Sequence, residues 1–306
     1  MLWFRKPAAE TVERDLIAPA APGVDFDPAL FRAHMNSLIE FARADGGIER
    51  YVESLSAKQQ LFNESLTEES LSRFDDGKLE ALLDTVFTAR RKLHPVLAEF
   101  GIDATAGAIR DLLYGNGELG QRVSAFVAAL PIREGEGLEA RRRAARLRRA
   151  AHDLACELLH FRDPLRYPLM VYWVWDEDTM SGALREFARN PDRVEKLPLD
   201  MRPETFEGAR RWLAGEIEGQ GIYRDVPLWI DLVKAAAYTH YFRSMTGGVL
   251  GSDFERGSKP EEQVKKLLGI DGERRGGKSR VVREDIKRED DKREDDKRDD
   301  MISGAA

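Results

Sequence analysis

Side chains of the kinds that bind transition metals recur at four-residue steps in the middle of the sequence. His152, Cys156 and His160 have this spacing. Glu157 adds a Glu-x-x-His motif, and side chains four apart share a helix face, where two of them can bind one metal ion. A di-iron bundle needs a second such motif, and the sequence contains only this one. We therefore interpret the four residues as core or boundary positions, and we predict no metal and no other cofactor.

Six arginines lie within nine residues, just before His152. They are Arg141, Arg142, Arg143, Arg146, Arg148 and Arg149. On a helix, such a cluster can contact the phosphates of DNA or RNA. Three glutamates lie just upstream, however, and arginine near a helix N-terminus opposes the helix dipole. We expect segment 141–149 to form a solvated or protein-facing surface, and a nucleic-acid interface is the alternative.

The most unusual composition lies at 160–176, which reads HFRDPLRYPLMVYWVWD. Its two prolines favour a turn and an extended step, which is typical of a rigid elbow in the core. The alternative is a pocket for an acidic or planar ligand, with aromatic walls and an arginine at its mouth. A second Arg-Asp pair, at 224–225, is a candidate to complete the same pocket. The candidate residues are Arg162, Asp163, Arg166, Tyr167, Tyr172, Trp173, Trp175, Arg224 and Asp225.

Motifs for catalysis are weak. Residues 272–279 match the G-x-x-x-x-G-K-S phosphate loop, but a buried strand must enter such a loop and a helix must leave it. The flanking sequences KKLLGID and VVREDIKRED offer neither, so we predict no nucleotide site there. The sequence also lacks a serine elbow, an HExxH motif and a CxxC pair. A metal- or ligand-dependent enzyme centred on 152–176 is therefore only the third functional hypothesis.

The elements that must position these residues are helices. Apolar residues recur at three- and four-residue steps from Pro28 onward, and the pattern predicts helices at 138–161, 179–189, 204–218 and 227–244. Only 169–175 has the composition of a strand. The fold class is therefore mainly α, as an irregular multi-helix bundle or as two helical lobes. We expect an extended arm at 1–26, helical regions at 27–132 and 138–250, and a linker with a charged tail at 251–306.

The end of the chain has a different character. The sequence KREDD occurs at 287–291 and again at 292–296, and KRDD follows. Few apolar side chains are present to compensate for the entropy of ordering, and a five-residue repeat forms no helical face. We therefore predict that this tail is disordered.

Composition limits the class of protein. The 306 residues are 42% hydrophobic and carry a net charge of −7, so a general attraction to nucleic acid or to an anionic membrane is not expected. One cysteine fits a reducing compartment, and the sequence has no apolar run long enough for a signal peptide or a membrane span. We expect a soluble, cytoplasmic, non-catalytic binding protein that acts as an adaptor, assembly or accessory factor and recognises a protein partner.

Overall fold

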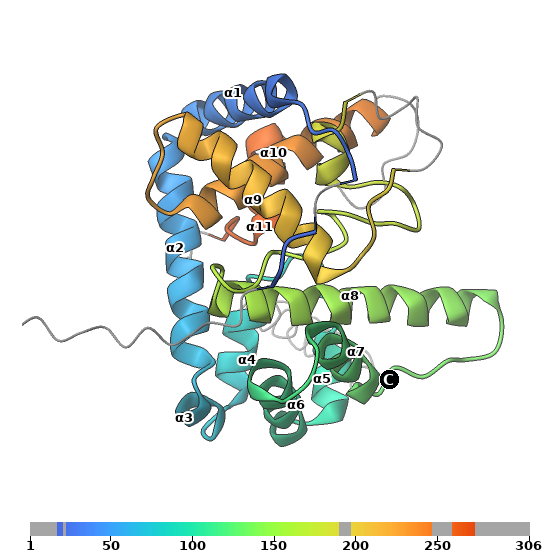
Figure 1. Ribbon diagram of the computed structural model, residues 1–306. Coiled ribbons are helices and arrows are strands. Elements are labelled where there is room, and N and C mark those ends of the chain that lie inside the picture. The colour runs from blue at the N-terminus through green and yellow to red at the C-terminus, as the bar shows by residue number, and fades with distance from the viewer. Residues whose placement is uncertain (1–16, 21–22, 190–196, 247–258, 273–306) are drawn as a thin grey trace, which may run out of the picture.

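The structure, a computed structural model, describes residues 17–20, 23–189, 197–246 and 259–272 of the 306-residue chain. Within these residues it contains eleven α-helices, one 3-10 helix and two isolated β-bridges, and no β-strand. The fold is mainly α, as the helical periodicity of the sequence predicts (Figure 1).

The first seven helices follow one another with short connections. Asp27 caps the first helix: its carboxylate accepts a hydrogen bond from the backbone N of Ala29 at 2.8 Å, and Pro28 occupies the first turn. Gly46 and Gly47 both have positive φ and turn the chain into the second helix. The bounds are α1 Pro28–Ala44, α2 Ile48–Ser65, α3 Glu68–Leu71, α4 Asp76–Leu83, α5 His94–Phe100, α6 Ile102–Tyr114 and α7 Leu119–Ala129.

The second half of the chain has longer helices, and three of them confirm the sequence prediction to within two residues at each end. The exposed, irregular stretch 133–137 leads into the longest of them. The bounds are α8 Leu138–Arg162, η1 Ala183–Phe187 (a 3-10 helix), α9 Pro203–Gly219, α10 Val226–Thr246 and α11 Pro260–Leu268.

Helix α8 crosses the centre of the molecule and organises the rest. Figure 1 shows α1, α9, α10 and α11 on one side of α8 and α4 to α7 on the other, while α2 runs past both groups. Buried apolar side chains of both groups belong to one continuous hydrophobic cluster. The structure therefore combines the two expected arrangements: two groups of helices share one long helix and one core.

The helix expected at 179–189 is absent, and the strand-like stretch 169–175 forms turns instead of a strand. Asp176 and Ser181 close a tight turn through two backbone hydrogen bonds, of 2.8 and 3.2 Å. Gly182 follows with φ 125°, and a Cβ there would lie 2.6 Å from the carbonyl oxygen of Val174. This close approach requires glycine and prevents a regular helix, so only the short η1 forms.

The range 251–306, expected to be a linker and tail, contains the helix α11. Val264, Leu267 and Leu268 have helical spacing and are buried, and α11 packs against α10 and α1. Gly269 ends the helix in the left-handed conformation. A Cβ at Gly269 would overlap the backbone of Thr85, so the site accepts only glycine. The charged repeats lie outside the described residues, as do 1–16 of the expected arm.

No helix in the described part of the chain combines the length and the apolar character that crossing a membrane requires.

Candidate functional site

The aromatic side chains of segment 160–176 are buried in the core, except for the half-buried Tyr172. Trp175 has no exposed surface, and Trp173 exposes only 6% of its area. Trp175 donates a hydrogen bond from Nε1 to the carbonyl oxygen of Leu199 at 3.2 Å, and Trp173 packs against Tyr238 of α10. The segment is therefore an elbow inside the core, and none of its residues lines the two large surface cavities found among the described residues.

The charged side chains of this elbow bind neighbouring groups of the protein. Arg162 donates to Asn63 Oδ1 of α2 at 2.8 Å. The carboxylate of Asp163 accepts a hydrogen bond from the backbone N of Arg166 at 3.2 Å and so stabilises the turn after α8. The guanidinium of Arg166 lies over the ring of Tyr167, 5.2 Å from its centre. These contacts hold the elbow in place. They also orient Arg162 and Arg166 toward groups of the protein itself.

The four residues with metal-ligand side chains point to different partners. Glu157 pairs with Lys58 of α2, with 2.6 Å between Oε2 and Nζ. His160 binds Asp231 through Nε2 at 2.7 Å and the carbonyl oxygen of Tyr167 through Nδ1 at 2.8 Å. The described residues contain no group of three metal-ligating side chains.

His152 and Cys156 form the other half of this set, and their geometry is not that of a reactive pair. The sulfur of Cys156 lies 3.8 Å from both ring nitrogens of His152. Equal distances place the sulfur beside the ring and not along the lone pair of one nitrogen, so the contact is no directed hydrogen bond. Cys156 is buried and behaves here as a small apolar residue.

Lys58 is the centre of a buried charge cluster between α2, α8 and α11. Its ammonium donates to Glu157, to the carbonyl oxygen of Thr85 at 2.8 Å and to that of Leu268 at 2.9 Å. It also lies 4.0 Å from the ring centre of Phe161. Burial lowers the pKa of Lys58 and raises that of Glu157, and their mutual attraction opposes both shifts. All three ammonium protons have acceptors, so the cluster is complete and structural.

A second buried cluster joins α8 to α10. Asp231 is fully buried. Its Oδ2 contacts Nε2 of His160, and its Oδ1 lies 2.9 Å from Nζ of Lys234. Burial acts to raise the pKa of Asp231, but the charges and hydrogen bonds of His160 and Lys234 outweigh it and lower the pKa to about 2. The carboxylate is therefore charged at neutral pH, with a hydrogen bond to His160 on Oδ2 and an ion-pair contact with Lys234 on Oδ1.

The arginine cluster lies on the N-terminal half of α8, which extends past its neighbours (Figure 1). Arg142 pairs with Glu139 and Arg148 with Glu134, at 3.0 and 2.7 Å. Arg149 binds Asp176 and stacks on Tyr172, 3.7 Å from the ring centre. The other three are exposed and form no ion pair with another described residue: Arg141, Arg143 and Arg146.

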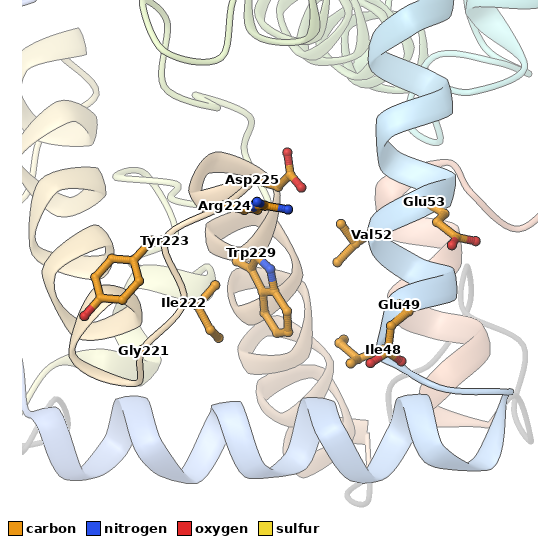
Figure 2. A pocket seen from close by; sticks show the side chains of 10 residues that line it. All are labelled: Ile48, Glu49, Val52, Glu53, Gly221, Ile222, Tyr223, Arg224, Asp225 and Trp229. Atoms are coloured by element: carbon orange, nitrogen blue, oxygen red, sulfur yellow. The ribbon is translucent and has the colours of Figure 1, made fainter.

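The remaining candidates, Arg224 and Asp225, line a surface groove of about 570 Å³. This groove, which we call the Trp229 groove, lies between the first turns of α2 and the loop that connects α9 to α10. Figure 2 shows Trp229 at its centre, between Ile222 on one side and the α2 side chains Ile48 and Val52 on the other. The candidate site is therefore this groove, whose full lining is Ile48, Glu49, Val52, Glu53, Gly221, Ile222, Tyr223, Arg224, Asp225 and Trp229.

A strained residue shapes the loop side of the groove. Asp225 has φ 55°, in the left-handed region that residues other than glycine adopt rarely and aspartate more often than most. Its carbonyl oxygen accepts the backbone N–H groups of Leu228 and Trp229 at 2.9 and 3.1 Å, which starts α10. The loop thus presents Arg224 and Asp225 beside Trp229, and Tyr223 nearby is 75% exposed.

Charges surround the apolar centre of the groove. Glu49 and Glu53 are exposed on α2, one helical turn apart. Neither they nor the Arg224–Asp225 pair makes an ion pair with any residue that the structure describes. The groove therefore offers an aromatic floor, aliphatic walls and a charged edge with a surplus of carboxylates.

Sequence reasoning named two residues of this groove and missed the rest. Ile48 and Val52 carry a helical pattern, and Glu49 and Glu53 repeat it one position later. Both pairs have four-residue spacing, so Ile48 and Val52 lie on one helix face and Glu49 and Glu53 lie on the adjacent face. Nothing in the sequence indicates that this edge faces Trp229, because only tertiary packing joins residues about 180 positions apart.

Comparison of the chain with protein-family models, with curated proteins and with solved structures found no match.

Proposed function

We propose that the protein is a non-catalytic binding protein, an adaptor or accessory factor, whose partner inserts an apolar side chain into the Trp229 groove. The observation that carries this proposal is a half-buried tryptophan enclosed by three aliphatic side chains and surrounded by unpaired charges. Interfaces between proteins are built in this way, with an apolar centre, a polar rim and an enrichment in Trp, Tyr and Arg.

The charges of the groove indicate the chemistry of the partner. Arg224 and Asp225 are neighbours and offset each other, whereas Glu49 and Glu53 leave two negative charges on the α2 side. Complementary charge favours correct encounter and suppresses wrong partners. The partner segment therefore carries Lys or Arg next to its apolar anchor.

The same lining argues against catalysis in the groove. The ten residues that form it include no histidine, cysteine, serine or lysine, so they offer no Ser–His or Cys–His pair and no lysine nucleophile. They also argue against nucleic acid here, because phosphate would meet the surplus carboxylates.

Nucleic-acid binding through α8 remains the alternative hypothesis. Three of the six arginines already have carboxylate partners, which reduces the positive charge that α8 offers. The three exposed arginines can equally contact an acidic region of a protein partner, which we prefer.

We further propose a cytoplasmic location. The chain has one cysteine, which is buried and forms no disulfide, and this fits a reducing compartment. Cell fractionation with antibodies to the native protein tests this, and recovery from an oxidising compartment would contradict it.

A peptide array tests the proposed function. The full chain is applied to short synthetic peptides in which one Leu, Phe or Trp is flanked by Lys/Arg, by Asp/Glu or by Ser. Peptides with basic flanks should bind, and Trp229→Ala should weaken that binding at least tenfold, as expected for an interface hot spot. Trp212→Phe, outside the groove, is the control. Equal binding of all three peptide classes would contradict the proposal.

A further inference from the structure

A second cavity, of about 620 Å³, lies between α1, the segment 179–188 and α10. We call it the histidine cavity. Its volume is within the range of pockets that hold small molecules. Its lining is separate from that of the Trp229 groove and is formed by Leu30, Ala33, His34, Ser37, Thr179, Met180, Arg185, Glu186, Ala188, His240, Tyr241, Ser244 and Met245.

One residue, Glu186, orients both histidines of this cavity. Its backbone carbonyl oxygen contacts Nε2 of His34 at 3.2 Å, and its carboxylate contacts Nδ1 of His240, also at 3.2 Å. A carbonyl oxygen only accepts hydrogen bonds, so Nε2 of His34 carries the proton. In a neutral imidazole the other nitrogen, Nδ1, is then a bare acceptor.

Nδ1 of His34 is buried and has no hydrogen-bond partner among the described residues. His34 as a whole is only 5% exposed. A buried polar atom without a partner is rare in folded proteins and destabilises the fold. An acceptor left open beside a cavity is a reason to expect that a ligand supplies the donor.

The protonation state of His34 fits an acceptor better than an acid or a base. Burial lowers the pKa of His34 to about 4; the bond to Glu186 opposes this shift and the nearby His240 adds to it. A base with so low a pKa removes protons poorly at neutral pH. The ring therefore stays neutral and offers a lone pair.

We propose that the histidine cavity binds a small, uncharged, flat ring that carries one hydrogen-bond donor, and that this donor bonds to Nδ1 of His34. Flatness follows from the walls, since Tyr241 and the His34 imidazole are planar and Met180 and Met245 make favourable sulfur contacts with aromatic rings. The ligand is uncharged because the opposite charges of Arg185 and Glu186 both line the cavity.

In this proposal His240 is the side chain that covers His34. Its ring lies against that of His34, with 5.5 Å between the ring centres and an interplanar angle of 67°. Its side chain is 61% exposed, and its contact with Glu186 is close to the surface. An exposed side chain can change rotamer without moving a helix, so we assign the opening of this site to His240.

Nitrogen NMR on the full chain with ¹⁵N-labelled histidine tests the proposal. The probes are phenol, which donates an O–H, and anisole, which has the same ring but no donor. Phenol should shift the Nδ1 resonance of His34 saturably, and anisole should bind about tenfold more weakly, as expected for one lost hydrogen bond. His34→Gln assigns the resonance, and the comparison of the two probes uses the unaltered protein.

A second variant tests the cover. His240→Ala removes an exposed side chain and should strengthen phenol binding severalfold. Equal affinities for phenol and anisole, a phenol response at other histidines but not at His34, or weaker phenol binding by His240→Ala would each overturn the proposal.

Discussion

The buried charge clusters and the Trp229 groove use the same kinds of side chain in opposite ways. In the interior, every proton of Lys58 has an acceptor and both oxygens of Asp231 contact a basic side chain. At the groove, Glu49 and Glu53 have no such partner among the described residues. Charges without a partner are inexpensive only in water, so paired charge belongs to the fold and unpaired charge is free to recognise another molecule.

The interior clusters also connect elements that are far apart in the sequence. Lys58 joins α2, α8, the turn at Thr85 and the end of α11, and Asp231 joins α8 to α10. Each group thereby fixes the relative position of several helices. The groove charges lie on one helix and one loop, where their loss should leave the fold unaffected.

Removal of one partner from the Lys58 cluster should have the largest effect on stability. Lys58→Ala leaves a buried carboxylate and two carbonyl oxygens without donors, so the free energy of unfolding should fall by about 3–5 kcal/mol. Lys58→Met/Glu157→Leu removes both charges and should be less destabilising than the single change. Arg43→Ala breaks an exposed pair of similar length, 2.7 Å, and should change stability by less than about 1 kcal/mol. Urea unfolding measures all three, and a small cost for Lys58→Ala would remove the contrast between interior and surface.

Two tryptophans allow the same comparison between interior and groove for apolar side chains. Trp175 is fully buried, so Trp175→Ala should cost about 3–5 kcal/mol, whereas Trp229→Ala should cost roughly half as much. Thermal or urea unfolding of the two variants gives the difference. If Trp229→Ala were the more costly change, Trp229 would be a core residue and the groove would lose its proposed role.

Acid should destabilise the fold through Asp231. The folded-state pKa of Asp231, about 2, lies below the unfolded value of about 3.9. Its contribution, roughly 2–3 kcal/mol, is therefore complete above about pH 5 and is lost as the pH falls through about 2. Asp231→Asn should flatten this part of the stability profile, and Glu49→Gln/Glu53→Gln should leave it unchanged. Parallel profiles for Asp231→Asn and the unaltered protein would contradict the assignment.

The smallest effect is expected on α8. Replacement of Arg141, Arg143 and Arg146 by Gln should change stability by less than about 0.5 kcal/mol, because these side chains are exposed. We also expect no DNA or RNA binding by the unaltered protein at ~0.15 M salt. Fluorescence anisotropy measures this. Tight, salt-dependent binding that the three substitutions abolish would make nucleic acid the leading function.

The sequence predicts the long elements well and the short ones poorly. Helices α8, α9 and α10 are clear because apolar periodicity continues over many turns. Helix α11 is missed because its nine residues lie between two strongly charged stretches that obscure the apolar face of Val264 and Leu267. The segment 179–189 is predicted wrongly because a close backbone contact at Gly182 overrides local helical propensity.

The candidate site is predictable only in part, and for the same reason. Arg224 and Asp225 are recognisable from a polar loop before a proline, but the α2 side chains that complete the groove come from tertiary packing. The aromatic elbow has the composition of either a pocket or a core, and burial of Trp175 by surrounding helices places it in the core. Local patterns do not report which surfaces the fold leaves open.

Charge reversal at the groove tests the central claim most directly. The affinities of the unaltered chain and of Glu49→Lys/Glu53→Lys are measured for two peptides that share one apolar anchor and differ only in basic or acidic flanks. Glu64→Lys/Glu136→Lys, which changes two exposed glutamates outside the groove, is the matched control. We predict that the groove variant exchanges its preference from the basic to the acidic peptide, while the control keeps the original preference. An unchanged preference in the groove variant would show that these carboxylates do not recognise the partner, and would contradict the account.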